Sequence, residues 1–150
     1  MAIQIPKSDL DELLFSSLRA IYQFERAKVA RFALTYEEIY LLQYLRRHSP
    51  SRMGDIAAEM TKPVSTATRL MDRLEKRGLV ARKKDRQDRR TIRVSLSAKG
   101  KQMVEAVENH THKAVSGNLE RFADEKIAAF VETARYLDEI LAVTEEREGR

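Results

Sequence analysis

The clearest pattern of apolar and polar positions lies between residues 60 and 96. In its first part, apolar residues recur at a helical spacing, at Val64, Ala67, Leu70, Met71 and Leu74. This spacing predicts one buried stripe along a helix, while polar residues project from the opposite side at about 100° per residue. Gly78 follows, and it can adopt the left-handed conformation that ends a helix. The pattern therefore predicts an amphipathic helix with an exposed polar face.

Two short strands follow this helix, at residues 79–82 and 91–96. Ile92, Val94 and Leu96 alternate with polar residues, which is the two-residue period of a half-buried strand. Residues 83–90 between the strands are too polar to be buried. A basic helix followed by a basic hairpin indicates a winged helix, since the helix fits a DNA major groove and the hairpin tip can reach an adjacent minor groove.

The remaining pattern predicts helices on both sides of this stretch. An amphipathic helix covers residues 8–31, and Thr35 with Glu38 forms a capping box that opens the next helix. A short helix at residues 53–60 and the turn at 61–63 complete a helix-turn-helix. Ser97 caps a long helix, and a last helix runs from Asp124 to Leu141. We expect a mainly α fold with a small two-stranded β-wing, as one domain over residues 1–150.

Positive charge is concentrated in the same stretch. Residues 62–93 hold twelve Lys or Arg against four Asp or Glu, a net charge of +8, whereas the whole chain carries +5. A polyanion partner such as DNA requires such a footprint. The alternative interpretation is a solvated, charged helix face, which is the usual role of charge runs.

Composition excludes several other classes of function. Charged residues make up 34% and apolar residues 43% of the chain, which is typical of a soluble globular protein. There is no cysteine, so disulfides and thiol nucleophiles are excluded. No apolar run approaches about 18 residues and no signal peptide core is present, so we expect a cytoplasmic protein without a membrane partner. Without a Gly-rich phosphate loop or a clustered acid–base constellation, we expect no enzyme and no cofactor.

The central segment is similar in sequence to a known family. Ser65 to Val80 reads STATRLMDRLEKRGLV, Asp88-Arg89-Arg90 follows, and Val94 to Gly100 reads VSLSAKG. Together with the order of elements, these residues resemble the MarR family of bacterial winged-helix transcriptional regulators over nearly the whole chain. Lys62 and Pro63 depart from the family pattern at the start of the recognition helix.

The resemblance implies a homodimer that binds double-stranded DNA. Residues of about 1–34 and 97–150 would form N- and C-terminal dimerisation helices, and residues of about 35–96 the winged helix-turn-helix lobe. The target would be a near-palindrome with half-sites about one helical turn apart. The positions that match base-facing ones are Ser65, Thr66, Thr68 and Arg69. Arg69 would make a bidentate contact to guanine, and Arg73 and Lys76 would hold phosphates.

In the wing, the resemblance implies two roles. Arg86 and Arg89 are the candidates for insertion into the minor groove, which favours A·T-rich flanks. Arg90, in the family's Asp-x-Arg pattern, would brace the wing through an ion pair with Asp88 or Asp72. The alternative for each wing arginine is a solvated side chain.

The resemblance also implies a cleft for a small, aromatic or anionic effector that releases DNA. The candidate lining residues are Phe15, Arg19, Tyr22, Tyr36, Tyr40 and Tyr44, although aromatic residues at helical spacing are more often plain core. We expect no metal site, because His110 and His112 lie about 200° apart on a helix and His48 is elsewhere.

The leading hypothesis is thus a homodimeric, sequence-specific transcription factor that acts as a repressor and responds to a small molecule. Two other functions stay open. A nonspecific architectural DNA binder would show affinity that depends on salt but not on sequence. A protein-interaction module on the same fold would not use the basic face.

Overall fold

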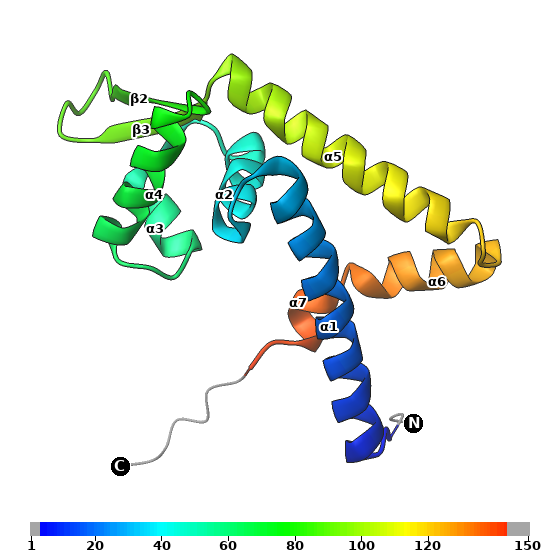
Figure 1. Ribbon diagram of the computed structural model, residues 1–150. Coiled ribbons are helices and arrows are strands. Elements are labelled where there is room, and N and C mark those ends of the chain that lie inside the picture. The colour runs from blue at the N-terminus through cyan, green and yellow to red at the C-terminus, as the bar shows by residue number, and fades with distance from the viewer. Residues whose placement is uncertain (1–3, 144–150) are drawn as a thin grey trace, which may run out of the picture. The chain divides into compact units, whose positions relative to one another are not determined.

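The computed structural model describes residues 4–143. Its elements, in the order that Figure 1 follows by colour, are α1 (Lys7–Phe32), α2 (Tyr36–Arg47), β1 (Ser51–Arg52), α3 (Met53–Glu59), α4 (Val64–Lys76), β2 (Val80–Lys84), β3 (Ile92–Leu96), α5 (Ala98–Leu119), α6 (Asp124–Ala134) and α7 (Leu137–Ile140). The prediction of a mainly α winged helix-turn-helix protein is confirmed.

The sheet has three antiparallel strands in the order β1-β3-β2, one more than we expected. Val94, in the middle of β3, pairs with Arg82 of β2 on one side and with Ser51 of β1 on the other. The two residues of β1 are too few to show any period, which is why the sequence predicts only the hairpin. Because β1 directly precedes α3, its pairing with β3 ties the wing to the start of α3.

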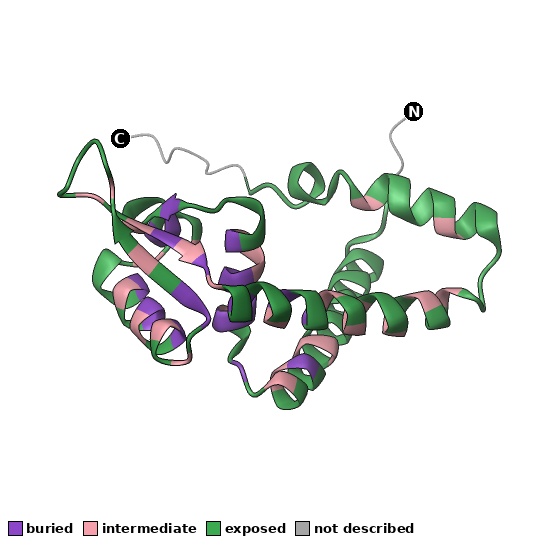
Figure 2. Ribbon diagram, turned by 90° about the horizontal axis from the view of Figure 1, so that it is seen from above, coloured by how far each residue is buried: buried purple, intermediate pink, exposed green. Residues whose placement is uncertain are grey.

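The core of the first compact unit, which ends at Glu108, is assembled from α2, α3, α4, the sheet and the start of α5. Purple segments in Figure 2 mark these buried positions. Ala67, Leu70, Met71 and Leu74 are at most 2% exposed, as the helical spacing predicts. Val64 is 53% exposed, so its predicted place in the buried stripe is wrong. It is the first residue of α4, at the edge of the core, and the buried stripe begins one turn later.

Two helix caps that the sequence predicts are present. The Thr35 hydroxyl accepts from the Glu38 backbone N–H at 3.1 Å, and the Glu38 carboxylate accepts from the Thr35 N–H at 2.9 Å. At the start of α5, the Ser97 hydroxyl accepts from the Gly100 N–H at 2.9 Å. Capping fixes where α2 and α5 begin, because the first N–H groups of a helix have no partner within it.

The second compact unit begins at Asn109, so the boundary between the units falls within α5. The single helix that we expected from Asp124 to Leu141 is wrong, because α6 ends at Ala134 and α7 begins at Leu137. Tyr136 between them has φ −101° and ψ 11°, outside the helical region. The apolar period continues across this break, so periodicity could not reveal it. The division into a lobe of residues 35–96 and separate dimerisation helices stays a prediction.

Candidate nucleic-acid interface

Helix α4 presents one polar face to solvent. Ser65, Thr66, Arg69, Arg73 and Lys76 are exposed, whereas the four core residues on the opposite side are buried. Arg69, Arg73 and Lys76 are spaced by four and three residues, so they lie along one side of the helix. Thr68 is half-buried, and its hydroxyl donates to the Val64 carbonyl at 2.8 Å. Thr68 is therefore the least available of the predicted base-facing residues.

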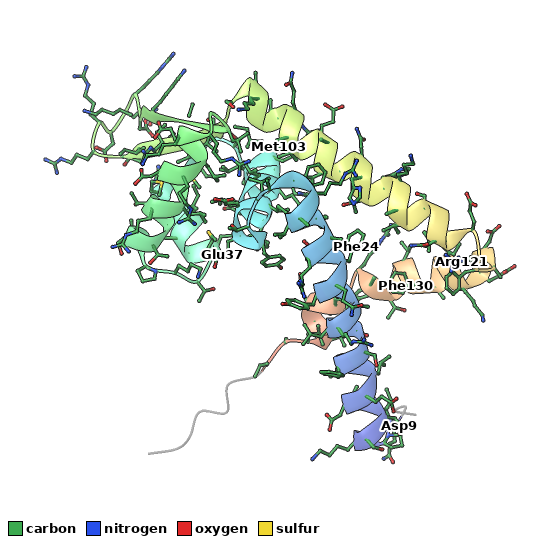
Figure 3. The ribbon with its side chains drawn as sticks, viewed as in Figure 1. Asp9, Phe24, Glu37, Met103, Arg121 and Phe130 are labelled. Carbon is green, nitrogen blue, oxygen red and sulfur yellow. The ribbon has the colours of Figure 1, made fainter. Side chains whose placement is uncertain are left out.

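The turn before α4 is held by two side-chain contacts from α2. The Lys62 ammonium pairs with the Glu37 carboxylate at 2.8 Å, and the Tyr40 hydroxyl donates to the Glu59 carboxylate. Figure 3 labels Glu37, near the start of α2. The hydrogen bond to Glu59, and then burial, raise the pKa of Tyr40 to about 12. Pro63 offers no side-chain cap, but its carbonyl accepts from the Thr66 and Ala67 N–H groups at 3.0 and 3.1 Å. The departure from the family pattern thus leaves the helix start intact.

The Glu38 carboxylate connects the start of α2 to α4. Glu38 is 4% exposed, and besides its role in the capping box it lies 3.4 Å from Arg73 Nε and 3.8 Å from Arg77 Nη1. Arg77 also donates to the Ala33 carbonyl at 2.7 Å. The sequence predicted the cap but not these ties to the recognition helix, because a capping box carries no information about partners 35 residues away.

The loop of the wing carries cations at its tip, and the Asp85 carboxylate ties its first residues to β3. Arg86 and Arg89 are exposed. Asp85 accepts from the Gln87 N–H at 2.8 Å and from Arg93 Nε at 2.5 Å. These hydrogen bonds, the backbone one first, lower the pKa of Asp85. In Figure 3, nitrogen-ended side chains extend outward from the hairpin of β2 and β3.

The predicted brace through Arg90 is wrong. Over residues 4–143 Arg90 forms no ion pair, and Asp72 pairs instead with Arg82 at 2.7 Å. Arg82 also binds Glu75, and that hydrogen bond is the main cause that raises the pKa of Arg82. Asp88 accepts from the Arg90 backbone N–H at 3.0 Å and from the Thr91 hydroxyl at 3.2 Å, so it shapes the turn.

The two-residue period of β2 could have found this brace. Val80 is buried, and Arg82 is two residues further along the strand, so both side chains lie on the face that covers α4. Arg82 therefore reaches the carboxylates of α4, whereas Arg90 lies in the exposed loop. The wing is fastened to the recognition helix at the middle of β2 and not at its tip.

Within residues 62–93, more of the basic side chains lack an ion pair than form one with the residues that the structure describes. Five of its twelve Lys or Arg residues form ion pairs, namely Lys62, Arg73, Arg77, Arg82 and Arg93. The other seven form none within residues 4–143: Arg69, Lys76, Lys83, Lys84, Arg86, Arg89 and Arg90. All seven are exposed. Such a surface attracts a polyanion over a range of about 8–10 Å at moderate salt.

The aromatic residues proposed to line an effector cleft are not brought together. Tyr40 and Tyr44 line a surface pocket of about 260 Å³ with Gln43, Arg47, His48 and Glu59. Phe15, Arg19, Tyr22 and Tyr36 are exposed and do not line it. Among these five aromatic residues, Tyr44 is the one that packs against the core. The alternative interpretation, that the aromatic residues belong to the core, therefore holds for Tyr44 and not for the other four.

The part of the chain that the structure describes has neither a metal-binding cluster nor a membrane-spanning helix. No group of three or more His, Cys, Asp or Glu side chains within residues 4–143 could hold a metal ion. None of the helices that the structure describes is long and apolar enough to cross a bilayer.

The fold and this cationic surface define a winged helix-turn-helix DNA-binding protein. The MarR family model matches residues 34–92. The uncharacterized HTH-type transcriptional regulator YsmB of Bacillus subtilis is 31% identical over 123 residues, which cover 82% of this chain and 84% of YsmB. The chain belongs to the MarR family of transcriptional regulators, which regulate transcription by binding DNA and are not enzymes.

Solved structures support the same fold. A MarR family protein from Bacillus stearothermophilus, 29% identical, has a TM-score of 0.81 over 89% of this chain and 94% of that one. Streptococcus pneumoniae FabT, in a crystal structure with DNA, has a TM-score of 0.78 over 91% of this chain and 97% of FabT. FabT is 19% identical, so it bears on the fold alone.

Proposed function

We propose that this regulator is a homodimeric repressor that reads a near-palindromic operator and is released from it by a small molecule. The proposal is carried by the exposed face of α4 next to the wing. Arg69 and Lys76 on α4, and Arg86 and Arg89 at the wing tip, are exposed and form no ion pair with any residue that the structure describes. Each recognition helix enters a major groove, and each wing reaches the minor groove beside it. Where the operator overlaps a promoter, the bound dimer excludes RNA polymerase from the same DNA.

The residues of this surface take different roles. Arg69 reads guanine through a bidentate contact, and Ser65, Thr66 and Thr68 contact neighbouring base edges. Arg73 and Lys76 hold phosphates, which gives affinity without sequence information. Arg86 and Arg89 enter the minor groove, where a narrow A·T-rich segment concentrates negative potential.

Exposed apolar side chains support the homodimer. Helix α1 exposes seven large apolar side chains that are 39–68% accessible: Leu10, Leu13, Leu14, Phe15, Leu18, Ile21 and Tyr22. The second unit separately exposes others, including Phe130, Val131 and Leu137. So many exposed large apolar side chains on one helix are typical of an interaction site. A dimer would have twice the 17.3 kDa of one chain, which sedimentation of the purified protein measures.

The effector component rests on aromatic side chains of α1 and α2, all exposed except the half-buried Tyr44. Phe15, Arg19 and Tyr22 on α1 and Tyr36, Tyr40 and Tyr44 on α2 offer flat apolar surfaces and one guanidinium, which suit an aromatic or anionic molecule. A DNA-bound regulator of this family acts where bacterial DNA lies, in the cytoplasm.

Selection from random DNA duplexes tests the DNA-binding proposal. The purified dimer should enrich two inverted half-sites whose centres lie about 10 base pairs apart. Enrichment of no sequence, with tight binding at low salt, would instead identify an architectural DNA binder. The absence of retained DNA at low salt would favour a protein-interaction module.

A further inference from the structure

Glu38 is a buried carboxylate with more partners than a helix cap needs. Its oxygens accept from the Thr35 N–H at 2.9 Å and face Arg73 Nε at 3.4 Å and Arg77 Nη1 at 3.8 Å. A buried carboxylate is costly unless hydrogen bonds and opposite charges surround it. The capping box alone would be served equally by a neutral glutamine at this position. The charge of Glu38 is therefore matched to the two arginines.

The contact to Arg73 uses one edge of the guanidinium and leaves the other open. Nε is the atom that faces Glu38, and the Arg73 side chain is still 55% exposed. Its two terminal nitrogens form no hydrogen bond within residues 4–143. Those two nitrogens form the planar fork that binds a phosphate through two parallel hydrogen bonds. Holding Nε thus orients the fork without occupying it.

We infer that Glu38 is a positioning residue for DNA binding, which holds the Nε edge of Arg73 so that the terminal nitrogens of that arginine meet a DNA phosphate. This inference rests on the proposed DNA-binding function of α4. Because the same carboxylate caps α2, the orientation of Arg73 is tied to the junction of α1 and α2, where Arg77 also binds the Ala33 carbonyl.

For the variant Glu38→Gln, the positioning role and the change of charge alone predict opposite changes in DNA affinity. Glu38→Gln removes one negative charge from the DNA-binding lobe, and charge alone would then strengthen the attraction for DNA. If Glu38 positions Arg73, the same substitution weakens binding, because the guanidinium must be ordered when DNA binds. Glutamine preserves the cap, so the helix remains intact.

A double-mutant cycle on the full chain measures this role. Affinity for one operator duplex is determined for the wild type, Glu38→Gln, Arg73→Gln and the double variant, over a salt series. We expect Glu38→Gln to weaken binding roughly fivefold in the wild type. In the Arg73→Gln background it should not weaken binding, because only the loss of a negative charge is then felt. Arg73→Gln should reduce the magnitude of the double-logarithmic salt slope by about 0.9, and adding Glu38→Gln should reduce it no further.

Glu108→Gln is the matched control, because Glu108 also pairs with an arginine, Arg46, at 3.5 Å. It should not weaken binding. An equal loss from Glu38→Gln in both backgrounds would overturn the inference, since it would reveal a structural role only. Tighter binding by Glu38→Gln would overturn it as well.

A second variant leaves Glu38 and its cap untouched. Arg73→Lys retains the charge but has no separate Nε edge for Glu38 to hold. We expect its affinity to fall below that of the wild type although the charge is kept, and wild-type affinity would contradict the inference. Operator preference of the wild type is measured in the same experiment. If the wild type shows no preference for the operator, the proposed function is refuted. The double-mutant cycle still tests the role of Glu38, because salt-dependent binding to any duplex reports on Arg73.

Discussion

Gly100 allows α5 to pack unusually close to the start of the wing. A Cβ atom at this position would lie 1.9 Å from the Leu79 carbonyl oxygen, 2.9 Å from its carbon and 3.3 Å from Leu96 Cδ2. The first two are backbone atoms, which cannot move aside as the end of a flexible side chain can. Gly100→Ala therefore has to push α5 away from the strand that follows Gly78.

Two opposing contributions set the change in the free energy of unfolding that we expect for Gly100→Ala. Overpacking of a tight core costs about 1–3 kcal/mol, and a 1.9 Å approach to backbone belongs at the upper end. Alanine returns up to about 1 kcal/mol through its higher helix propensity. We expect a net loss of about 2 kcal/mol in the free energy of unfolding, or roughly 4–8 °C in melting temperature for a chain of this size.

The assay is urea unfolding followed by circular dichroism, with Gly54→Ala as the matched control. Gly54 also lies in a helix of the first unit, but a Cβ atom added there would have nothing within 4 Å. This variant should therefore be neutral or stabilised by up to about 1 kcal/mol. A Gly100→Ala protein within about 0.5 kcal/mol of the wild type would refute the close packing of α5 on Leu79.

Three further predictions concern the DNA-binding lobe. Arg69→Ala should lose about 1–3 kcal/mol of discrimination at one operator position, and unchanged base preference in a competition assay would refute its base-reading role. Arg89→Ala should weaken binding and lower the magnitude of the salt slope by about 0.9, so a constant slope would remove the wing tip from the interface. Tyr40→Phe should abolish the tyrosine that titrates near pH 12 in ultraviolet absorbance. Because the pKa of Tyr40 is raised from 10.0, its stabilising bond to Glu59 is fully present below about pH 10 and is lost as pH approaches 12, which unfolding of both proteins across that range would detect.

The sequence predicted well those features that depend on local pattern. The buried stripe of α4, the capping box of Thr35 and Glu38 and the alternation of β3 at Val94 and Leu96 each follow from residues within a few positions of one another. Ile92, expected on the buried side of β3, is 41% exposed, because it lies at the end of the strand next to the wing loop. The family resemblance added the exposed residues of α4 and the wing. The strand β1 was missed because two residues carry no period, and the break at Tyr136 because the apolar pattern runs through it.

Long-range ion pairs were the least predictable features. Arg90 and Arg82 are both arginines of the wing. The two-residue period of β2 places Arg82 on the side that covers α4, but only the packing of β2 on α4 shows that its partners are Asp72 and Glu75. Glu38 has the sequence signature of a cap, yet its contacts with Arg73 and Arg77 depend on how α2 packs against α4. Such pairs require the three-dimensional arrangement, because neither charge nor spacing selects a partner among twelve basic residues.

We propose above that α4 and the wing read a specific DNA sequence. The most direct test is binding of the purified protein to the DNA upstream of its own gene and to a scrambled duplex of the same length and composition, across a salt series. We predict tighter binding to the native duplex at every salt concentration, with both affinities falling as salt rises. Equal, salt-dependent affinity for both duplexes would contradict sequence-specific recognition at this site.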